Sequence, residues 1–155
     1  MVPKPIPVGP RLSPRQLSLL SASMRHVRDS AALLADTPNR SVDQAWHLIG
    51  FGPECVRKAC LSEDWADKAL GHELGDRAAR LLDFAIALDP TAWRLGLVQT
   101  GPVAPLASWA PAVRYDRTGT ASEAATREAA AAARDVVDST IVTLWSSGLL
   151  EEVPQ

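Results

Sequence analysis

The chain has 155 residues, of which 46% are hydrophobic and 22% charged, and its formal net charge is -2. The length fits one globular domain that can bury a core, and the composition is that of an ordinary globular protein. The chain lacks the strong positive charge of proteins that bind nucleic acid non-specifically. No apolar run approaches the roughly 20 residues of a membrane span. Lys4 and Arg11 are not accompanied by the apolar stretch of a signal peptide. We therefore expect a cytoplasmic protein without a membrane partner.

The two ends of the chain differ from its middle. Residues 1–12 contain prolines at positions 3, 5, 7 and 10, which prevent a helix and favour an extended arm. This arm is either a disordered leader or a segment that docks on a partner. Residues 151–155 are expected to form a loose tail, so the folded domain is predicted over 13–150.

The first helix is predicted from Ser13, which can cap it, with Pro14 at the first helical position and Gln16 completing a capping box. Apolar residues then recur at alternating spacings of three and four, which is typical of a heptad seam. The positions of this seam are Leu17, Leu20, Met24, Val27, Ala31 and Leu34.

The next helix is predicted over 41–61, from a capping box of Ser41 and Gln44. Pro53 lies inside it, close to two glycines, and a proline in a helix interior removes one hydrogen bond at a cost of about 3 kcal/mol. We therefore expect a kink or a break into two helices. A break leaves the backbone carbonyls of 46–49 in need of other partners.

The remaining elements are also predicted to be helical. Short helices are expected over 62–70 and 91–98, and a longer one over 73–88, whose buried face is predicted to be Leu74, Ala78, Leu81, Ala85 and Leu88. A connection over 99–119 leads to a capping box of Thr120 and Glu123 and to the longest helix, which Gly148 ends. Since no strand pattern occurs, the predicted fold is an all-α, up-and-down bundle of four main helices plus short ones.

The last helix is rich in alanine, which allows another helix to approach closely. Its buried face is predicted to be Ala125, Ala129, Ala132, Val136, Thr140 and Leu144, with Ala133, Val137 and Ile141 beside them. This face and the heptad seam of the first helix together predict a homodimer or a subunit of a protein complex.

Few residues stand in a pattern with a known chemistry. Cys55 and Cys60 are predicted to be free thiols, because five positions along a helix turn them to different faces. The three histidines, His26, His47 and His72, have no recognised metal-binding spacing, and no glycine-rich phosphate loop occurs. We predict neither a metal site nor a cofactor.

Charged residues give two weaker signals. Glu54 and Lys58 form an i,i+4 pair, either solvated or partly buried against the loop after 73–88. Arg114 precedes the last helix, whose N-terminus favours anions. Arg114 is therefore expected either to bind an anion there or to brace the long connection. The best anion-binding candidates are Arg114, Arg117 and Arg127.

Three stretches in order resemble one known family: "AWHLIGFGPECVRKACL", "GHELGDRAARLLDFA" and "WAPAVRYDRTGTASEAATREAAAAARDVVDSTI". They are similar to the bacterial HEPN (higher eukaryotes and prokaryotes nucleotide-binding) domain over residues 14–148. The matching positions are Glu54, Cys55, Lys58, Ala59, His72, Leu74, Trp109, Arg114 and Tyr115.

The resemblance implies a bundle of four to five helices that usually dimerises. Many HEPN domains are ribonucleases of toxin–antitoxin, phage-defence or CRISPR systems, and others are non-catalytic or pair with a nucleotidyltransferase. Catalytic members use an arginine followed, after four to six residues, by a histidine. Arg114 takes the arginine place, but Gly119, Thr120 and Ala121 stand where the histidine belongs. The groove that the resemblance implies consists of Arg114, Tyr115, Glu54, Lys58, His72 and Trp109.

Three functions follow as hypotheses. The first is a catalytically degenerate HEPN-like domain, not an enzyme, that binds RNA or a nucleotide or serves as partner in a defence or toxin–antitoxin complex. The second is a structural dimer or scaffold without a ligand, and the third an active ribonuclease in which His72 or Tyr115 replaces the missing base. We also expect Arg114 to pair with Glu54 and hold the long connection in place.

Overall fold

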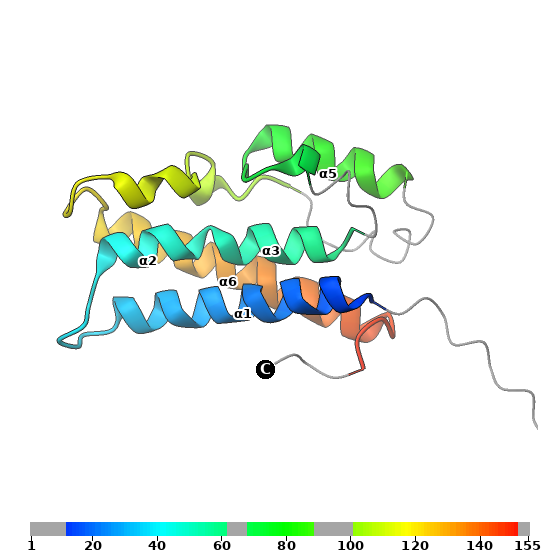
Figure 1. Ribbon diagram of the computed structural model, residues 1–155, viewed down its shortest axis with the longest axis horizontal. Coiled ribbons are helices and arrows are strands. Elements are labelled where there is room, and N and C mark those ends of the chain that lie inside the picture. The colour runs from blue at the N-terminus through cyan, green and yellow to red at the C-terminus, as the bar shows by residue number, and fades with distance from the viewer. Residues whose placement is uncertain (1–11, 62–67, 89–100, 152–155) are drawn as a thin grey trace, which may run out of the picture.

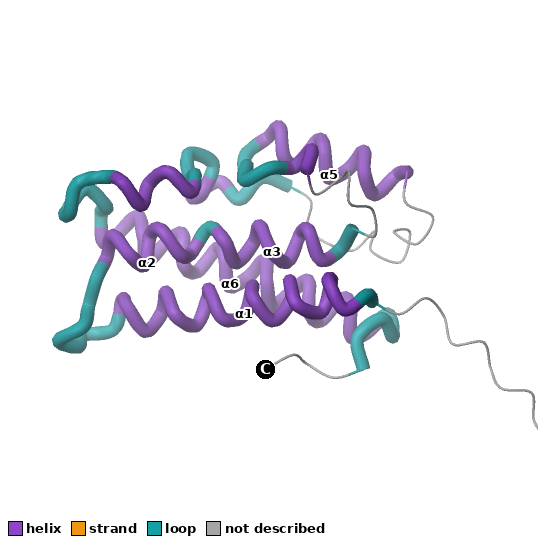
Figure 2. The backbone as a smooth tube through the Cα atoms, viewed as in Figure 1, coloured by secondary structure: helices purple, strands orange, loops and turns teal. Residues whose placement is uncertain are grey.

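A computed structural model describes residues 12–61, 68–88 and 101–151 of the chain. Every regular element in these residues is helical, and none is a strand (Figure 2). The predicted all-α class is confirmed. In Figure 1, the first helix lies beside two shorter helices that follow one another, the last helix lies behind them, and a further layer covers one side. The arm over 1–12 and the tail over 151–155 lie outside the described residues except for Leu12 and Glu151.

Helix α1 spans Pro14–Leu34 and begins with the predicted capping box between Ser13 and Gln16. Gln16 is buried and its side-chain amide donates to the carbonyls at the end of the neighbouring helix, Ala59 at 3.0 Å and Leu61 at 3.4 Å. The start of α1 is therefore fixed by hydrogen bonds inside the bundle as well as by its cap.

The predicted heptad seam of α1 is half wrong. The buried stripe repeats every seven residues but includes polar side chains: Gln16, Leu20, Ser23, Val27, Ser30 and Leu34. The two serines are buried because their hydroxyls donate to backbone carbonyls, Ser23 to Leu20 and Ser30 to Ala45. Leu17, Met24 and Ala31 consequently lie at the edge of the core, and Leu17 is 40% exposed.

The second predicted helix is broken into α2, Val42–Ile49, and α3, Phe51–Ala59, with Gly50 between them. The predicted break is confirmed, and the two helices continue in nearly the same direction (Figure 1). Pro53 has no N–H to donate to the carbonyl four residues earlier. Of the carbonyls of 46–49 that a break was expected to leave in need of partners, those of Trp46 at 3.1 Å and His47 at 3.2 Å accept from the indole N–H of Trp109.

Helix α5 spans Asp76–Leu88 and packs on a small second core with Leu61 and Leu70. Its predicted face is partly wrong: Leu88 is 56% exposed and Leu81 only partly buried. The buried positions are Ala78, Ala79, Leu82 and Ala85. Of the predicted short helices, residues 68–70 are helical, whereas 62–67 and 91–98 lie outside the described residues.

The long connection contains two 3₁₀ helices, η2 over Ala104–Leu106 and η3 over Pro111–Tyr115, before α6 begins. Helix α6 spans Glu123–Ser146, and its N-cap is Ser122 rather than the predicted Thr120. The Ser122 hydroxyl accepts from the Ala125 N–H, whereas the Thr120 hydroxyl donates to the Arg117 carbonyl at 2.6 Å and so forms a turn of its own.

The main core lies between α1, the α2–α3 pair and α6. Helix α6 buries a stripe close to the predicted one, Thr126, Ala129, Ala133, Val136, Val137, Thr140, Ile141 and Leu144, while Ala125 is exposed. Gly148 follows the end of α6 with a φ of 70°, the left-handed conformation that ends many helices. Within the described ranges, no helix has the length and apolarity to cross a membrane.

Candidate functional site

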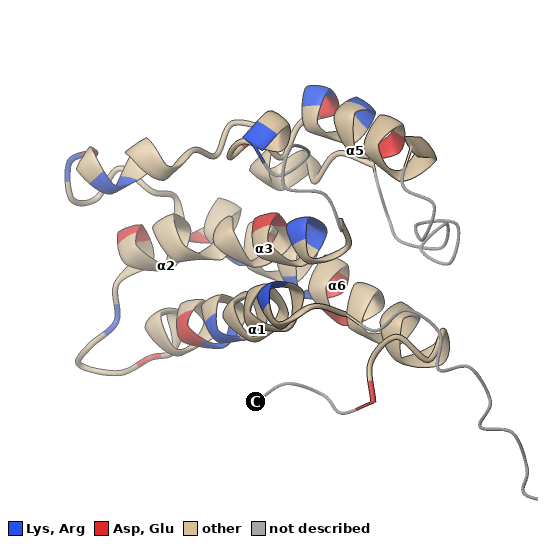
Figure 3. Ribbon diagram, turned by 45° about the vertical axis from the view of Figure 1, so that its right-hand side comes forward, with Lys and Arg blue, Asp and Glu red and all other residues tan. Residues whose placement is uncertain are grey.

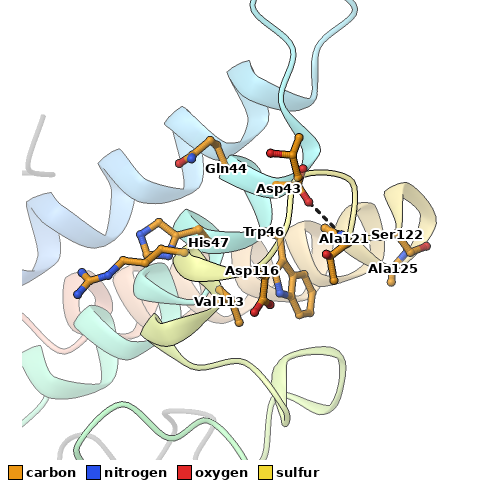
Figure 4. Close-up of a pocket in the computed structure, with 12 residues that line it drawn as sticks. Asp43, Gln44, Trp46, His47, Val113, Asp116, Ala121, Ser122 and Ala125 are labelled. Carbon is orange, nitrogen blue, oxygen red and sulfur yellow. Dashed lines mark hydrogen bonds between the residues drawn. The ribbon is translucent and has the colours of Figure 1, made fainter.

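A cavity of about 270 Å³ lies where α2, η3 and the start of α6 meet (Figure 4). It carries an aromatic ring, an imidazole, charged groups of both signs and several hydroxyls. Its lining residues are Asp43, Gln44, Trp46, His47, Val113, Arg114, Asp116, Thr118, Thr120, Ala121, Ser122 and Ala125. Such a polar mixture suits a small ligand that has both apolar and charged parts.

Asp43 closes one side of this cavity. Its carboxylate accepts hydrogen bonds from the backbone N–H of Gly119 at 2.8 Å and of Ala121 at 3.0 Å, the second drawn as a dashed line in Figure 4. These two bonds lower the pKa of the Asp43 carboxyl below its usual value. Gly119 has a φ of 86°, which explains a glycine at this turn. The segment before α6 is thus tied to the first turn of α2.

His47 contributes an imidazole to the cavity from α2. Its Nδ1 atom is buried and has no hydrogen-bond partner in the part of the chain that the structure describes. Its ring meets the Phe51 ring edge to face, with centroids 5.3 Å apart. Burial, and then the positive charge of Arg114, lower the pKa of His47 below 6.5. The imidazole is therefore neutral at pH 7 and can accept a hydrogen bond or a proton.

Arg114 lines the same cavity from η3. Its guanidinium lies over the Tyr115 ring, 4.7 Å from the centroid, and the side chain is exposed. The predicted pair of Arg114 with Glu54 is wrong: no ion pair joins them among the described residues. No carboxylate of the described residues is ion-paired with Arg114, so its donors are available to a ligand.

Glu54 lies in a different group. Its carboxylate is nearly buried, with 8% of the side chain exposed, and accepts from Lys58 Nζ at 2.8 Å. The Nδ1 atom of His72 lies 2.9 and 3.0 Å from the two Glu54 oxygens. The partly buried alternative for the Glu54–Lys58 pair is therefore the correct one, and the pair meets the turn before α5 through His72; residues 89–100 of the loop after α5, which the pair was predicted to face, lie outside the described residues.

The other predicted site residues are dispersed. Trp109 is 3% exposed and packs edge to face against Phe51, so it belongs to the core. Tyr115 is 76% exposed. Arg127 bonds to Glu123 and to the Leu34 carbonyl and lines a separate cavity between α1 and α6.

The three predicted anion-binding arginines thus do not converge, since Arg117 lines neither of these two cavities. Charges of both signs are spread over the helices, as on α5 (Figure 3). Of the three arginines, Arg114 is the one that shares a cavity with other candidate ligand-binding residues, Trp46 and His47.

Sequence reasoning missed His47 as a site residue. The spacing of four between His47 and Phe51 puts their side chains on one face of a helix, but nothing local to the sequence indicates that Arg114 returns to this face. Among the described residues, no three His, Cys, Asp or Glu side chains are placed to bind a metal ion. Cys55 and Cys60 are free, as predicted, and burial raises their thiol pKa values to about 11 and about 12.

No protein-family model, curated protein or solved structure matches this chain. The candidate site is therefore defined by its own geometry: a cavity that combines Arg114, His47 and Trp46, with Asp43 fixing the segment that closes it.

Proposed function

We propose that this chain is a catalytically degenerate, HEPN-like domain that binds a phosphate group of a nucleotide or of RNA in the cavity between α2, η3 and α6. Following the family resemblance, we also propose that it acts as a partner module of a defence or toxin–antitoxin complex. The observation that carries the binding proposal is that Arg114, His47 and Trp46 line one cavity.

Each of these side chains suits a different part of a nucleotide. A guanidinium forms two parallel hydrogen bonds to a phosphate, and an indole ring is a surface on which a base stacks. The neutral His47 imidazole can accept a hydrogen bond from a ribose hydroxyl. Asp116 adds a negative charge to the lining, which favours a single phosphate group over a polyphosphate.

The first prediction concerns Arg114. We expect Arg114→Ala to weaken binding of a labelled single-stranded RNA about tenfold, the value of one hydrogen bond to a charged group. Because Arg114 is exposed and not ion-paired to Glu54, the variant should keep the melting temperature of the wild type. Fluorescence anisotropy measures the affinity and thermal denaturation the stability.

Arg117→Ala is the matched control. It also removes an arginine charge, three residues after Arg114, but the Arg117 side chain does not line the cavity. Its effect on affinity should stay within about threefold, as for an exposed charge that solvent and salt screen. Equal losses in both variants, or no RNA binding by the wild type, would contradict the proposed site.

An active ribonuclease is the second candidate, and the position of His47 favours it. Thr120 and Ala121, which stand where the family histidine belongs, line the same cavity as His47. An imidazole is thus present beside Arg114, supplied by α2, and neutral His47 could take the proton of a ribose 2′-OH. If the wild type cleaves RNA, and cleavage disappears in His47→Gln but persists in His72→Gln, the protein is an active ribonuclease and not a catalytically degenerate domain.

A homodimer is proposed from the groove between α1 and α6. Two adjoining cavities of about 390 and 290 Å³ share Val27, Ala31 and Arg134 along this groove. Trp145 and Val142 on α6 are 52% and 64% exposed, and a second copy of the chain would cover them.

We expect light scattering at micromolar concentration to give twice the chain mass of 16.6 kDa. Trp145→Glu should yield the monomer, because it places a charge in the contact, whereas Phe84→Glu, which changes a similarly exposed aromatic residue on α5, should leave the dimer intact. A strict monomer for the wild type would refute the dimer.

A further inference from the structure

All three histidines of the chain lie on one strip of the surface. The ring centroids of His26 and His47 are each 5.3 Å from that of Phe51, and the Nδ1 of His72 contacts Glu54, three residues after Phe51 on α3. Neither composition nor spacing indicated that residues so far apart in the sequence would meet.

The strip follows a single helical face. His47, Phe51, Glu54 and Lys58 are separated by four, three and four residues, which keeps them on one side of the α2–α3 pair. Eleven residues at 1.5 Å each give a length of about 16 Å from His47 to Lys58. One end of the strip is the Arg114 cavity, because His47 belongs to both.

The charged groups along the strip carry a net charge of −1 at neutral pH, from three positive and four negative side chains. Positive groups are Arg25, Lys58 and Arg114, and negative groups are Asp29 beside His26, Glu54 between Lys58 and His72, and Asp43 and Asp116 at the cavity. The Cys55 thiol is neutral, since its pKa is raised to about 11. Protonation of the His26 and His47 imidazoles would change this net charge from −1 to +1.

We propose that this histidine strip continues the Arg114 cavity as a track for single-stranded RNA, with tighter binding when His26 and His47 are protonated. The proposal rests on the function proposed above and extends its site from one phosphate to several nucleotides. Proteins that bind single strands combine positive charge along the backbone path with aromatic rings on which bases stack, and Phe51 lies half-buried in the middle of this strip.

Protonation is expected within an accessible pH range. Burial, followed by the charge of Arg25, lowers the pKa of His26 below 6.5, and burial followed by Arg114 does the same for His47. Both imidazoles are therefore neutral at pH 7 and take up protons below about pH 6.5. A phosphate close to an imidazole favours its charged form, so RNA binding and proton uptake reinforce each other.

The test is the affinity for a labelled oligouridylate of about six nucleotides, measured at about pH 8 and about pH 5.5 over a range of salt concentrations. We expect tighter binding at the lower pH and a salt dependence steeper by about 0.7 for each added phosphate contact. The variant His26→Gln removes an imidazole of the strip that lies outside the cavity lining, and it should lose part of the gain in affinity between about pH 8 and about pH 5.5.

A second measurement avoids variants. The proton resonances of the His26 and His47 imidazoles, followed by NMR against pH, should show higher pKa values with RNA than without it. An affinity for RNA that depends on Arg114 but not on pH, with imidazole pKa values unchanged by RNA, would overturn the track while leaving the cavity proposal intact. RNA binding that is insensitive to Arg114→Ala but raises the imidazole pKa values would overturn the cavity proposal and support the track. Absence of RNA binding at both pH values would overturn the cavity and the track together.

Discussion

Gly50→Ala is expected to destabilise the protein by about 2–3 kcal/mol, although alanine is normally the better helix residue. Gly50 has φ −68° and ψ −25°, which any residue can adopt, and alanine at a helical position is favoured by about 1 kcal/mol. The added Cβ would lie 2.1 Å from two atoms of the Trp109 ring. Because the indole is buried and bonded to the Trp46 and His47 carbonyls, it cannot move aside cheaply, and overpacking costs 1–3 kcal/mol or more.

The prediction can be tested with a double-mutant cycle measured by chemical denaturation. Trp109→Ala alone should cost about 3–5 kcal/mol as a buried aromatic residue is lost. In that background, Gly50→Ala should be neutral or stabilising, because its steric cost has gone. Gly101→Ala is the control, since an added Cβ there meets nothing within 4 Å. Equal costs for Gly50→Ala with and without the indole would show that the ring does not select the glycine.

Signals confined to a few neighbouring residues were predictable from the sequence. The capping box of Ser13 and Gln16 and the break near Pro53 each depend on backbone chemistry within one or two helical turns, and both are present. The cap of α6 was misplaced by two residues because Thr120 and Ser122 are both chemically able to cap. Only the turn that Thr120 makes with Arg117 decides between them.

Residues that depend on tertiary contacts were predicted poorly. A hydrophobic pattern cannot identify Ser23 and Ser30 as buried, since their burial depends on backbone acceptors. The candidate groove of Arg114, Glu54 and His72 is divided between two places, because η3 brings Arg114 to His47 while the turn before α5 brings His72 to Glu54. The helix order alone does not determine either approach.

Glu54→Ala is expected to cost about 3 kcal/mol of unfolding free energy, the largest effect of any charged residue considered above. The side chains of Glu54 and Lys58 are only 8% and 12% exposed, and deleting one partner of a buried pair costs 3–5 kcal/mol because the other charge stays desolvated. We expect the lower end of this range, about 3 kcal/mol, because the flexible Lys58 side chain can carry its ammonium toward water. Glu54 also contacts His72 in the turn before α5, so α5 should lose protection from hydrogen exchange before α1 does.

Glu73→Ala is the matched control, because Glu73 forms the same i,i+4 arrangement with Arg77 while 46% and 65% of these side chains are exposed. An exposed pair contributes between about 0 and 1 kcal/mol, so Glu73→Ala should cost less than Glu54→Ala. Glu54→Leu combined with Lys58→Met replaces both charges by apolar groups and should recover most of the stability. If the double variant were as unstable as Glu54→Ala, the cost would come from lost hydrogen bonds to the turn before α5 rather than from an unbalanced charge on α3.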